Sequence, residues 1–438
     1  MFVRDGAAFL PESVYSAVPN DVVMSRAAAR TALPLGAVLR DLDARFADGD
    51  EYHELLLHLV LEGRRGAASF WAPYLATLPS LDTAAPTLPL LYEFGGDTPI
   101  NASSADAALS AALAGATALP DILAYRSRVR RTYSAVARHV FTPYAPVFGS
   151  RGIPYPEYAC TLIGQGHSRT RTNTTTHNAH ALTHAGATHI MDTRVIWWDG
   201  ARHLVPMLDA VNCAAGVTAG RVHATVAGGG AALTRADRAY GSGDQVWEDY
   251  GQRNVIYYTF HGFTLRDNAY DCVDVRLADD DAMEAAPPAV LQGLKDLEPA
   301  VEAGGGARAV LSRSVLGLVA CIPTPPTPAG AVARAAALRI ATDAIALVTN
   351  ASAPEAARLI ATAVEGQAAA LAAGSVAARA AAAGCAACNP APDRTGTDDL
   401  LPPPSPRVCA RACSQLAYLG GEAAGLRTVA ADVVTPAK

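Results

Sequence analysis

The pattern of apolar residues changes at about Asp280 of this 438-residue chain. From Ala187 to Leu277, apolar residues alternate with polar or small ones in short runs separated by glycine-rich turns, which predicts short β-strands. After Asp280 the chain is rich in alanine and its large apolar residues follow helical spacing, which predicts helices. Strands gathered in one part of a chain and helices in another indicate an α+β fold.

Composition and pattern divide the chain into four parts. Residues 1–150 mix helical and loop patterns, with one clear amphipathic helix near residues 52–60. Residues 151–186 hold four of the eleven histidines among Thr, Asn, Arg and Gly and have few large apolar residues, so we interpret them as a mobile, low-complexity insertion. Residues 187–280 form the predicted β part, and residues 281–438 form a predicted helical domain.

Composition also excludes several classes of protein. The net charge is −6 and no basic stripe is present, so we expect no nucleic-acid partner. The longest weakly charged stretch, residues 366–388, is built from Ala and Gly and contains Arg379, so we expect no membrane span. The N-terminus lacks the apolar core of a secretory signal, and the eight scattered cysteines do not resemble a disulfide scaffold. We therefore expect a soluble intracellular protein, with cytoplasm, nucleus and plastid all open as its compartment.

Generic catalytic signatures are absent, because the chain has no GxSxG, no P-loop and no HExxH motif. Three ordered segments are informative instead. They are SFWAPYLATLP at residues 69–79, DTR at 192–194 with LVPMLDAVNC at 204–213, and GDQVWEDYGQRN at 243–254 with HGF at 261–263.

These segments resemble, in order and in spacing, the motifs of the SET-domain proteins related to Rubisco large-subunit methyltransferase and actin-histidine methyltransferase. The resemblance covers about residues 15–280, apart from the insertion. It implies a SET-domain β fold of short strands with a helical insertion, followed by an all-α C-terminal substrate-binding domain. It also implies a protein-lysine N-methyltransferase that uses S-adenosyl-L-methionine as cofactor and acts on a non-histone protein substrate.

Methyl transfer to a lysine sets a clear demand on the site. With a pKa of about 10.4, the amine is neutral in only about one molecule in a thousand at pH 7. The enzyme must accept the neutral form and aim its lone pair at the methyl carbon, and such positioning supplies much of the rate. A tyrosine hydroxyl at the end of a narrow channel can donate to or accept from the nitrogen. By the resemblance, Tyr250 is that catalytic tyrosine.

The resemblance assigns four further residues to the cofactor. Arg194 is similar to an arginine that contacts the carboxylate end of the donor, a task that suits a guanidinium because it forms two parallel hydrogen bonds with a carboxylate. Asn212 is similar to the Asn of the family's Asn-His pair, which holds the donor. Asp209 and Cys213 flank Asn212 in the same segment.

The last matching segment, His261, Gly262 and Phe263, resembles the part of the family that lies against the donor and the target channel. Phe263 offers a ring face, which attracts a sulfonium or ammonium cation. His261 is a candidate for selecting the target or for accepting a proton. We interpret Trp71, Tyr74 and Pro79 as packing residues between the helical insertion and the SET core.

Three departures from the family keep alternatives open. In one of them, Gly186 and Ala187 stand where the family usually has Trp-Ala. The family's glycine-rich donor-binding segment has no counterpart before residues 18–24, and Cys213 stands where the family has His. The alternatives are a protein-histidine N-methyltransferase and a non-catalytic SET-like protein-binding module.

The cysteines near the C-terminus have a nearly zinc-like spacing, with CxxC at residues 385–388 and CxxxC at 409–413. Because these pairs fall at the end of one predicted helix and within another, we interpret them as packing cysteines and expect no metal site.

Overall fold

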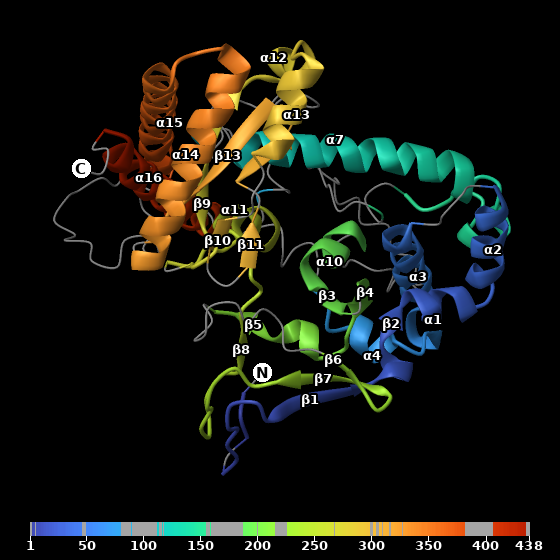
Figure 1. Cartoon of the computed structure of the whole chain (residues 1–438). Coiled ribbons are helices and arrows are strands. Elements are labelled where there is room, and N and C mark those ends of the chain that lie inside the picture. Colours follow the sequence, from blue (N-terminus) through green and yellow to red (C-terminus); the bar gives the residue numbers. More distant parts are fainter. Residues whose placement is uncertain are drawn as a thin grey trace, which may run out of the picture. The chain divides into compact units, whose positions relative to one another are not determined.

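The structure, a computed structural model shown in Figure 1, divides into two compact units. Unit 1 comprises Met1–Ala85 and Arg126–Tyr250, and unit 2 comprises Pro86–Tyr125 and Gly251–Lys438. Most of the insertion predicted at residues 151–186 lies outside the described residues and stays a prediction. The structure describes residues 2–4, 6–45, 50–79, 89, 112–113, 116, 118–154, 158, 187–198, 200–214, 226–266, 268–297, 301–303, 306–308, 310–314, 317–325, 327–381 and 406–434.

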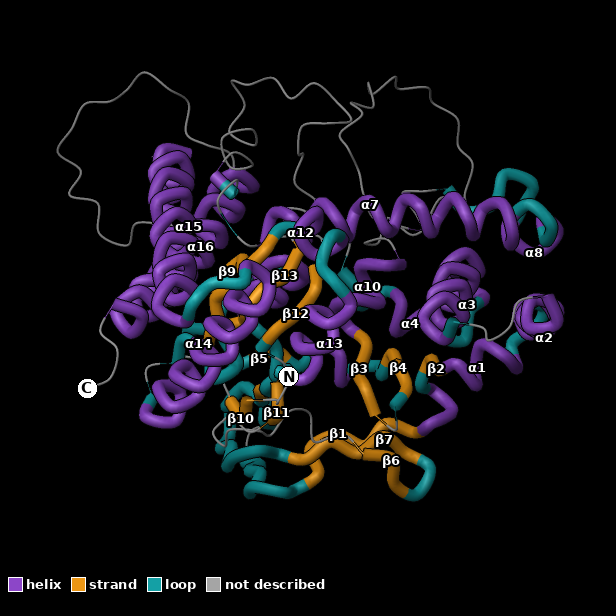
Figure 2. The backbone as a smooth tube through the Cα atoms, turned by 45° about the horizontal axis from the view of Figure 1, so that its top comes forward, coloured by secondary structure: helices purple, strands orange, loops and turns teal. Residues whose placement is uncertain are grey.

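Short strands form the sheets of unit 1. One antiparallel sheet has the order β1-β7-β6 and another has the order β2-β4-β3, whereas β5 and β8 form a parallel pair (Figures 1 and 2). The strands of unit 1 are β1 (Val14–Pro19), β2 (Met24–Ser25), β3 (Val195–Trp198), β4 (Ala201–Leu204), β5 (Asn212–Cys213), β6 (Val226–Gly228), β7 (Ala231–Arg235) and β8 (Trp247–Glu248).

Alternation along the strands builds the core of the β part. In β7, Ala232 and Thr234 are buried while their neighbours are partly or fully exposed, as a pleated strand with one covered face requires. Ala232 lies opposite Val18 of β1. Both belong to one apolar cluster with Val205 and Val246, which come from the two segments that carry the predicted site residues.

The amphipathic helix predicted near residues 52–60 is confirmed as α3 (Glu51–Arg65). The Asp50 carboxylate accepts a hydrogen bond from the backbone N–H of Tyr52 and so caps the helix. Leu55 and Leu56 are fully buried on its apolar face. Other α-helices described in unit 1 are α1 (Arg26–Thr31), α2 (Leu35–Arg45), α4 (Ala72–Leu75), α8 (Ala145–Phe148) and α10 (Ala187–Arg194), and α7 (Ala118–Val136) contains the division between the units.

A three-stranded antiparallel sheet of order β12-β13-β9 forms the β part of unit 2, and β10 pairs with β11. The predicted alternation at Val273, Val275 and Leu277 is confirmed, because all three are buried in β9. Strands also lie between residues 301 and 323, within residues 281–438, which were predicted to be helical. The strands of unit 2 are β9 (Cys272–Ala278), β10 (Val301–Ala303), β11 (Gly306–Arg308), β12 (Leu311–Ser314) and β13 (Gly317–Pro323).

Helices α14, α15 and α16 pack together, and α14 also packs on β13 (Figures 1 and 2). Among the described residues one helix, Ala353–Arg379 within α15, is long and apolar enough to cross a membrane. Its Ile360, Val364 and Leu371 are buried in the core of unit 2, which fits a core helix. Among the described residues of unit 2, the α-helices after α7 are α11 (Asn254–Ile256), α12 (Asp280–Glu284), α13 (Pro288–Asp296), α14 (Pro328–Thr349), α15 (Ala353–Ala381) and α16 (Pro406–Val434).

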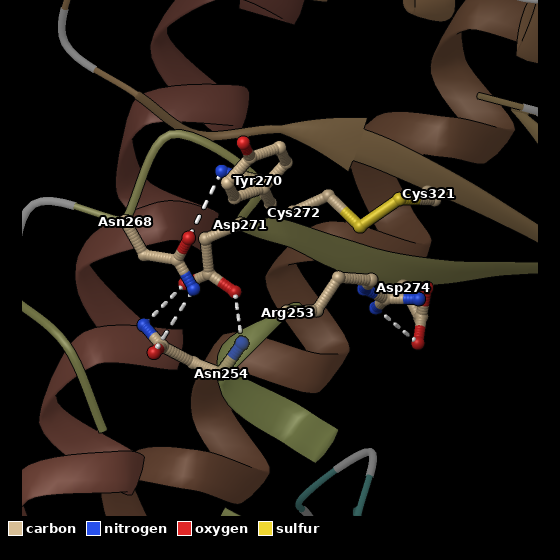
Figure 3. Close-up of a disulfide and its surroundings, with 8 residues drawn as sticks. All are labelled: Arg253, Asn254, Asn268, Tyr270, Asp271, Cys272, Asp274 and Cys321. Atoms are coloured by element: carbon tan, nitrogen blue, oxygen red, sulfur yellow. Dashed lines mark hydrogen bonds and ion pairs between the residues drawn. A yellow bond between two sulfur atoms is a disulfide. The ribbon is translucent and has the colours of Figure 1, made fainter. Parts of the chain in front are cut away.

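A disulfide joins β9 to β13 (Figure 3). Cys272 and Cys321 have Cα atoms 5.4 Å apart. They are diagonal neighbours on adjacent strands, because the register pairs Cys321 with Asp274 and Cys272 with Pro323. The sequence analysis did not predict this bond.

The C-terminal cysteines are only partly described. Cys413 is disulfide-bonded, so its interpretation as a packing cysteine was wrong. Cys385 and Cys388 lie outside the described residues, and so does the side chain of Cys409.

Candidate active site

The parallel pairing of β5 with β8 brings two predicted motifs of unit 1 together. Asn212 pairs with Trp247 and Cys213 with Glu248, and the Ala214 amide donates to the Glu248 carbonyl at 3.0 Å. The segment that ends at Cys213 and the segment that leads to Tyr250 therefore lie side by side.

Tyr250 lies two residues after β8 and contacts the residue that precedes β5. Its hydroxyl donates a hydrogen bond to the backbone carbonyl of Val211. Burial raises the pKa of the Tyr250 phenol, the neighbouring Cys213 and Glu248 raise it further, and the charge of Arg194 opposes them. The phenol therefore keeps its proton at neutral pH, and it can orient a nitrogen by hydrogen bonding without acting as a tyrosinate base.

The partly exposed Arg194 pairs with the buried Asp209, and both charges act on Tyr250. The Arg194 Nη1 group donates to the Asp209 carbonyl at 3.0 Å and approaches its carboxylate Oδ2 at 3.4 Å. Only 2% of the Asp209 side chain is exposed, against 24% for Arg194. Burial raises the pKa of the Asp209 carboxyl, while the Arg194 charge and a hydrogen bond from Tyr74 lower it.

Asn212 and Cys213 lie in β5 with different exposure. Asn212 is exposed, and Cys213 is a half-buried thiol. Pairing of both β5 residues with β8 holds the backbone of this segment in register. The Asn212 side chain is exposed to solvent.

Three predicted residues lie in unit 2, at the end of a π-helical turn named η6 (Tyr257–His261). Gly262 adopts a left-handed conformation with φ of 76°, which favours glycine, and its amide donates to Tyr258 at 3.2 Å. The ring of Phe263 stacks on Tyr257 at 5.0 Å between centroids, and the ring of His261 lies 5.8 Å from that of Phe263. The rings of Tyr257, His261 and Phe263 therefore form an aromatic cluster at the end of η6.

Asn254 holds the segment that follows Phe263. Its Oδ1 accepts from the Leu265 amide at 2.9 Å and its Nδ2 donates to the Leu265 carbonyl at 2.9 Å. Asp271 in turn accepts from the amide and the Nδ2 group of Asn254, at 3.0 and 2.8 Å (Figure 3). Asn254 is the last residue of the GDQVWEDYGQRN motif, and the sequence pattern alone indicated no role for it.

The structure thus places the predicted residues in two groups. Tyr250, Arg194, Asp209, Asn212 and Cys213 belong to unit 1. His261, Gly262 and Phe263 belong to unit 2. The charges of Arg194 and Asp209 act directly on Tyr250, so the first group forms one electrostatic environment.

The first group fits one end of the expected cofactor. S-Adenosyl-L-methionine carries a carboxylate, and the Arg194 guanidinium is partly exposed while Asp209 holds only its Nη1 group. Within the described part of the chain, the Nε and Nη2 groups of Arg194 have no hydrogen-bond acceptor. They leave a fork that matches a carboxylate.

The N-terminal segment runs beside the approach to β8. Phe2 bridges to Gln245, Phe9 bridges to Tyr240, and the Val3 amide donates to the Asp244 carbonyl at 2.8 Å. These contacts fix the turn that precedes β8.

A possible metal-binding group lies elsewhere, in unit 2. Among the described residues, Cys272, Asp274 and Cys321 have ligand atoms within 4.8 Å of one another. Both sulfurs are joined in the disulfide, and the Asp274 carboxylate lies 2.7 Å from the Arg253 guanidinium. A cation would therefore meet neither thiolates nor an unpaired carboxylate here.

A cavity of about 630 Å³ opens on unit 1 away from these residues. Residues of α1, Trp71, Glu62 and Arg65 line it, and none of the predicted site residues does. Arg65 pairs with the buried Glu62 at 2.5 Å, so these two charged groups of the lining neutralise each other.

Comparison with known proteins supports the fold. No protein-family model and no curated protein matches the chain. The SET domain of LSMT bound to lysine and AdoHcy matches 98% of this chain and 82% of its own, with 15% identity and a TM-score of 0.54. Rubisco LSMT bound to AdoMet matches 98% and 83%, with 15% identity and a TM-score of 0.54. The SET domain of LSMT bound to MeLysine and AdoHcy matches 98% and 83%, with 16% identity and a TM-score of 0.56.

These matches confirm the α+β fold expected from the resemblance, with the short antiparallel sheets in its N-terminal part and helices toward its C-terminus.

Proposed function

We propose that this protein is an S-adenosyl-L-methionine-dependent protein-lysine N-methyltransferase that acts on a non-histone protein. The observation that carries the proposal is the buried, protonated Tyr250 phenol beside the Arg194–Asp209 pair. The similar LSMT structures, which share the fold, hold lysine with AdoHcy, or AdoMet.

The proposed cofactor-binding residues have different chemical roles. S-Adenosyl-L-methionine supplies the methyl group as a sulfonium. Arg194 binds the carboxylate end through its outward N–H groups, and Asp209 keeps the guanidinium from rotating. Asn212 and Cys213 hold the donor through the segment that β8 keeps in register.

Three residues of unit 2 also match motifs that the resemblance assigns to donor binding. Gly262 allows the chain to turn sharply after η6, and Phe263 presents an aromatic ring backed by Tyr257. An aromatic face stabilises a cation by its quadrupole. His261 flanks that ring and is the residue whose size and charge would select the target side chain.

Tyr250 orients the target amine. Because its hydroxyl donates to the Val211 carbonyl, its oxygen can accept a hydrogen bond from the N–H of the neutral amine and leave the nitrogen lone pair free to face the methyl group. Burial around the hydroxyl also disfavours the charged ammonium, which increases the share of neutral amine at the site. Both effects reduce the barrier through positioning, with no covalent enzyme intermediate.

The Tyr250→Phe variant tests the proposal. We expect turnover to fall about a hundredfold or more while the affinity for AdoHcy stays within about twofold, since positioning of the reacting group is lost and donor contacts are kept. Tyr133→Phe is the matched control, because the Tyr133 hydroxyl donates to the Ile153 carbonyl at 2.9 Å and has no part in the site. Equal turnover of Tyr250→Phe and wild type would remove Tyr250 from the mechanism.

A further inference from the structure

Tyr74 makes a hydrogen bond that its sequence context did not predict. Its hydroxyl donates to the Asp209 carboxylate Oδ2 at 2.9 Å. The two residues are 135 positions apart in the chain. Tyr74 is 6% exposed, so no water competes freely for this carboxylate oxygen.

The same carboxylate oxygen faces Arg194. Oδ2 of Asp209 receives the Tyr74 hydroxyl at 2.9 Å and the Arg194 Nη1 group at 3.4 Å. Tyr74, Asp209 and Arg194 thus form one connected chain of donors and acceptors in unit 1. Arg194 is its partly exposed end and Tyr74 its buried end.

The hydroxyl also influences the charge of Asp209. Burial raises the pKa of the Asp209 carboxyl, and the hydrogen bond from Tyr74 is among the interactions that lower it again. Without that bond, the carboxyl keeps its proton to higher pH and attracts Arg194 less.

The neighbourhood of Tyr74 is well fixed. The Trp71 indole N–H donates to the Val22 carbonyl at 2.9 Å, and the Ser69 hydroxyl donates to the buried Glu62 at 2.7 Å. The Thr77 hydroxyl donates to the Tyr74 carbonyl at 2.7 Å. The short helix α4 therefore presents the Tyr74 ring from a rigid support.

We propose that Tyr74 is a positioning residue, which acts through Asp209 to keep the Arg194 guanidinium oriented toward the carboxylate of the methyl donor. The proposal rests on the proposed function, since it needs Arg194 to bind that carboxylate. It makes the segment SFWAPYLATLP part of the donor site as well as a packing element.

Two ligands separate positioning from general structure. AdoHcy carries the amino-acid carboxylate, whereas 5′-methylthioadenosine keeps the nucleoside and lacks that end. Calorimetry on the full chain should show that Tyr74→Phe weakens AdoHcy binding about tenfold, the effect of a weakened charged hydrogen bond. Binding of 5′-methylthioadenosine should stay within about twofold of wild type. Tyr133→Phe, which removes another tyrosine hydroxyl from unit 1, should change neither affinity.

The results distinguish a failure of the positioning role of Tyr74 from a failure of the proposed function. If wild type binds AdoHcy and Tyr74→Phe weakens both ligands equally or neither, the positioning role is wrong and the proposed function stands. If wild type binds no AdoHcy, the proposed function fails and the role of Tyr74 fails with it.

A second measurement on wild type guards against a variant that does not fold. Protonation of Asp209 at low pH should weaken AdoHcy binding while 5′-methylthioadenosine binding stays constant, over a pH range in which circular dichroism shows the fold intact. A parallel loss of both ligands, or no loss of either, would overturn the positioning role.

Discussion

Removal of the Cys272–Cys321 disulfide is expected to lower the free energy of unfolding substantially. The bond closes a loop with a sequence separation of 49 residues. Constraining a loop of that length in the unfolded chain corresponds to about 4 kcal/mol at 25 °C in the chain-entropy treatment. For a unit of this size, that loss lowers the melting temperature by about 10 °C.

The folded state should change little when the bond is removed. Val273 pairs with Ile322 next to the disulfide, both are buried, and the β9–β13 ladder continues through Val275. The expected loss therefore comes mainly from the unfolded chain, so backbone structure by circular dichroism should be retained.

Urea unfolding of the Cys272→Ala/Cys321→Ala double variant measures the effect in oxidising buffer. The control repeats wild type and variant with a dithiol reductant, where both lack the bond and should agree within about 1 kcal/mol. A difference below about 1 kcal/mol in oxidising buffer would refute the reasoning. So would a difference that persists unchanged under reduction.

Three further predictions concern buried polar groups. Asn254→Ala removes the Nδ2 hydrogen bonds to Asp271 and to the Leu265 carbonyl and leaves the Leu265 amide without its Oδ1 acceptor, so urea unfolding should show a loss of about 3 kcal/mol; a loss below 1 kcal/mol would contradict this. Burial raises the pKa of Asp192 to about 7, so this group lowers stability as pH rises from about 4 to 7, and Asp192→Asn should gain on wild type more at pH 8 than at pH 5. Burial lowers the pKa of His58 to about 4, so stability falls as pH drops from about 6.5 to 4, and His58→Leu should lose less than wild type between pH 7.5 and pH 5. Parallel pH profiles of variant and wild type would contradict either pH prediction.

Local periodicity predicted the helix and the strand whose buried faces repeat within a few residues. The helical spacing near residues 52–60 corresponds to α3, and the alternation of Val273, Val275 and Leu277 corresponds to the buried face of β9. Both patterns reflect which side chains one element buries, and that information lies within a few consecutive residues.

Pairings between distant segments were not predictable in the same way. β13 is a seven-residue strand, GLVACIP, buried on both faces, so it shows no alternation that separates it from a buried helix. The Cys272–Cys321 bond depends on the register of β9 against β13, and cysteine positions alone do not define connectivity.

In the candidate site, too, contacts between distant segments were not predictable from the sequence. The motifs pointed to Tyr250, Arg194 and Asp209, and their assignment to catalysis and donor binding stays a prediction. The sequence did not reveal that Tyr74 donates to Asp209, because a hydrogen bond across 135 residues leaves no local pattern. Asn254 was likewise visible as a motif residue, but its partners Leu265 and Asp271 lie on a loop whose course only the fold defines.

The most direct test of the central claim is methyl transfer itself. The full chain is incubated with isotopically labelled S-adenosyl-L-methionine and a protein lysate, and labelled peptides are located by mass spectrometry. We expect label on lysine side chains of a non-histone protein with wild type and no label with Tyr250→Phe. Label confined to histidine, or no label above a reaction without enzyme, would contradict the claim.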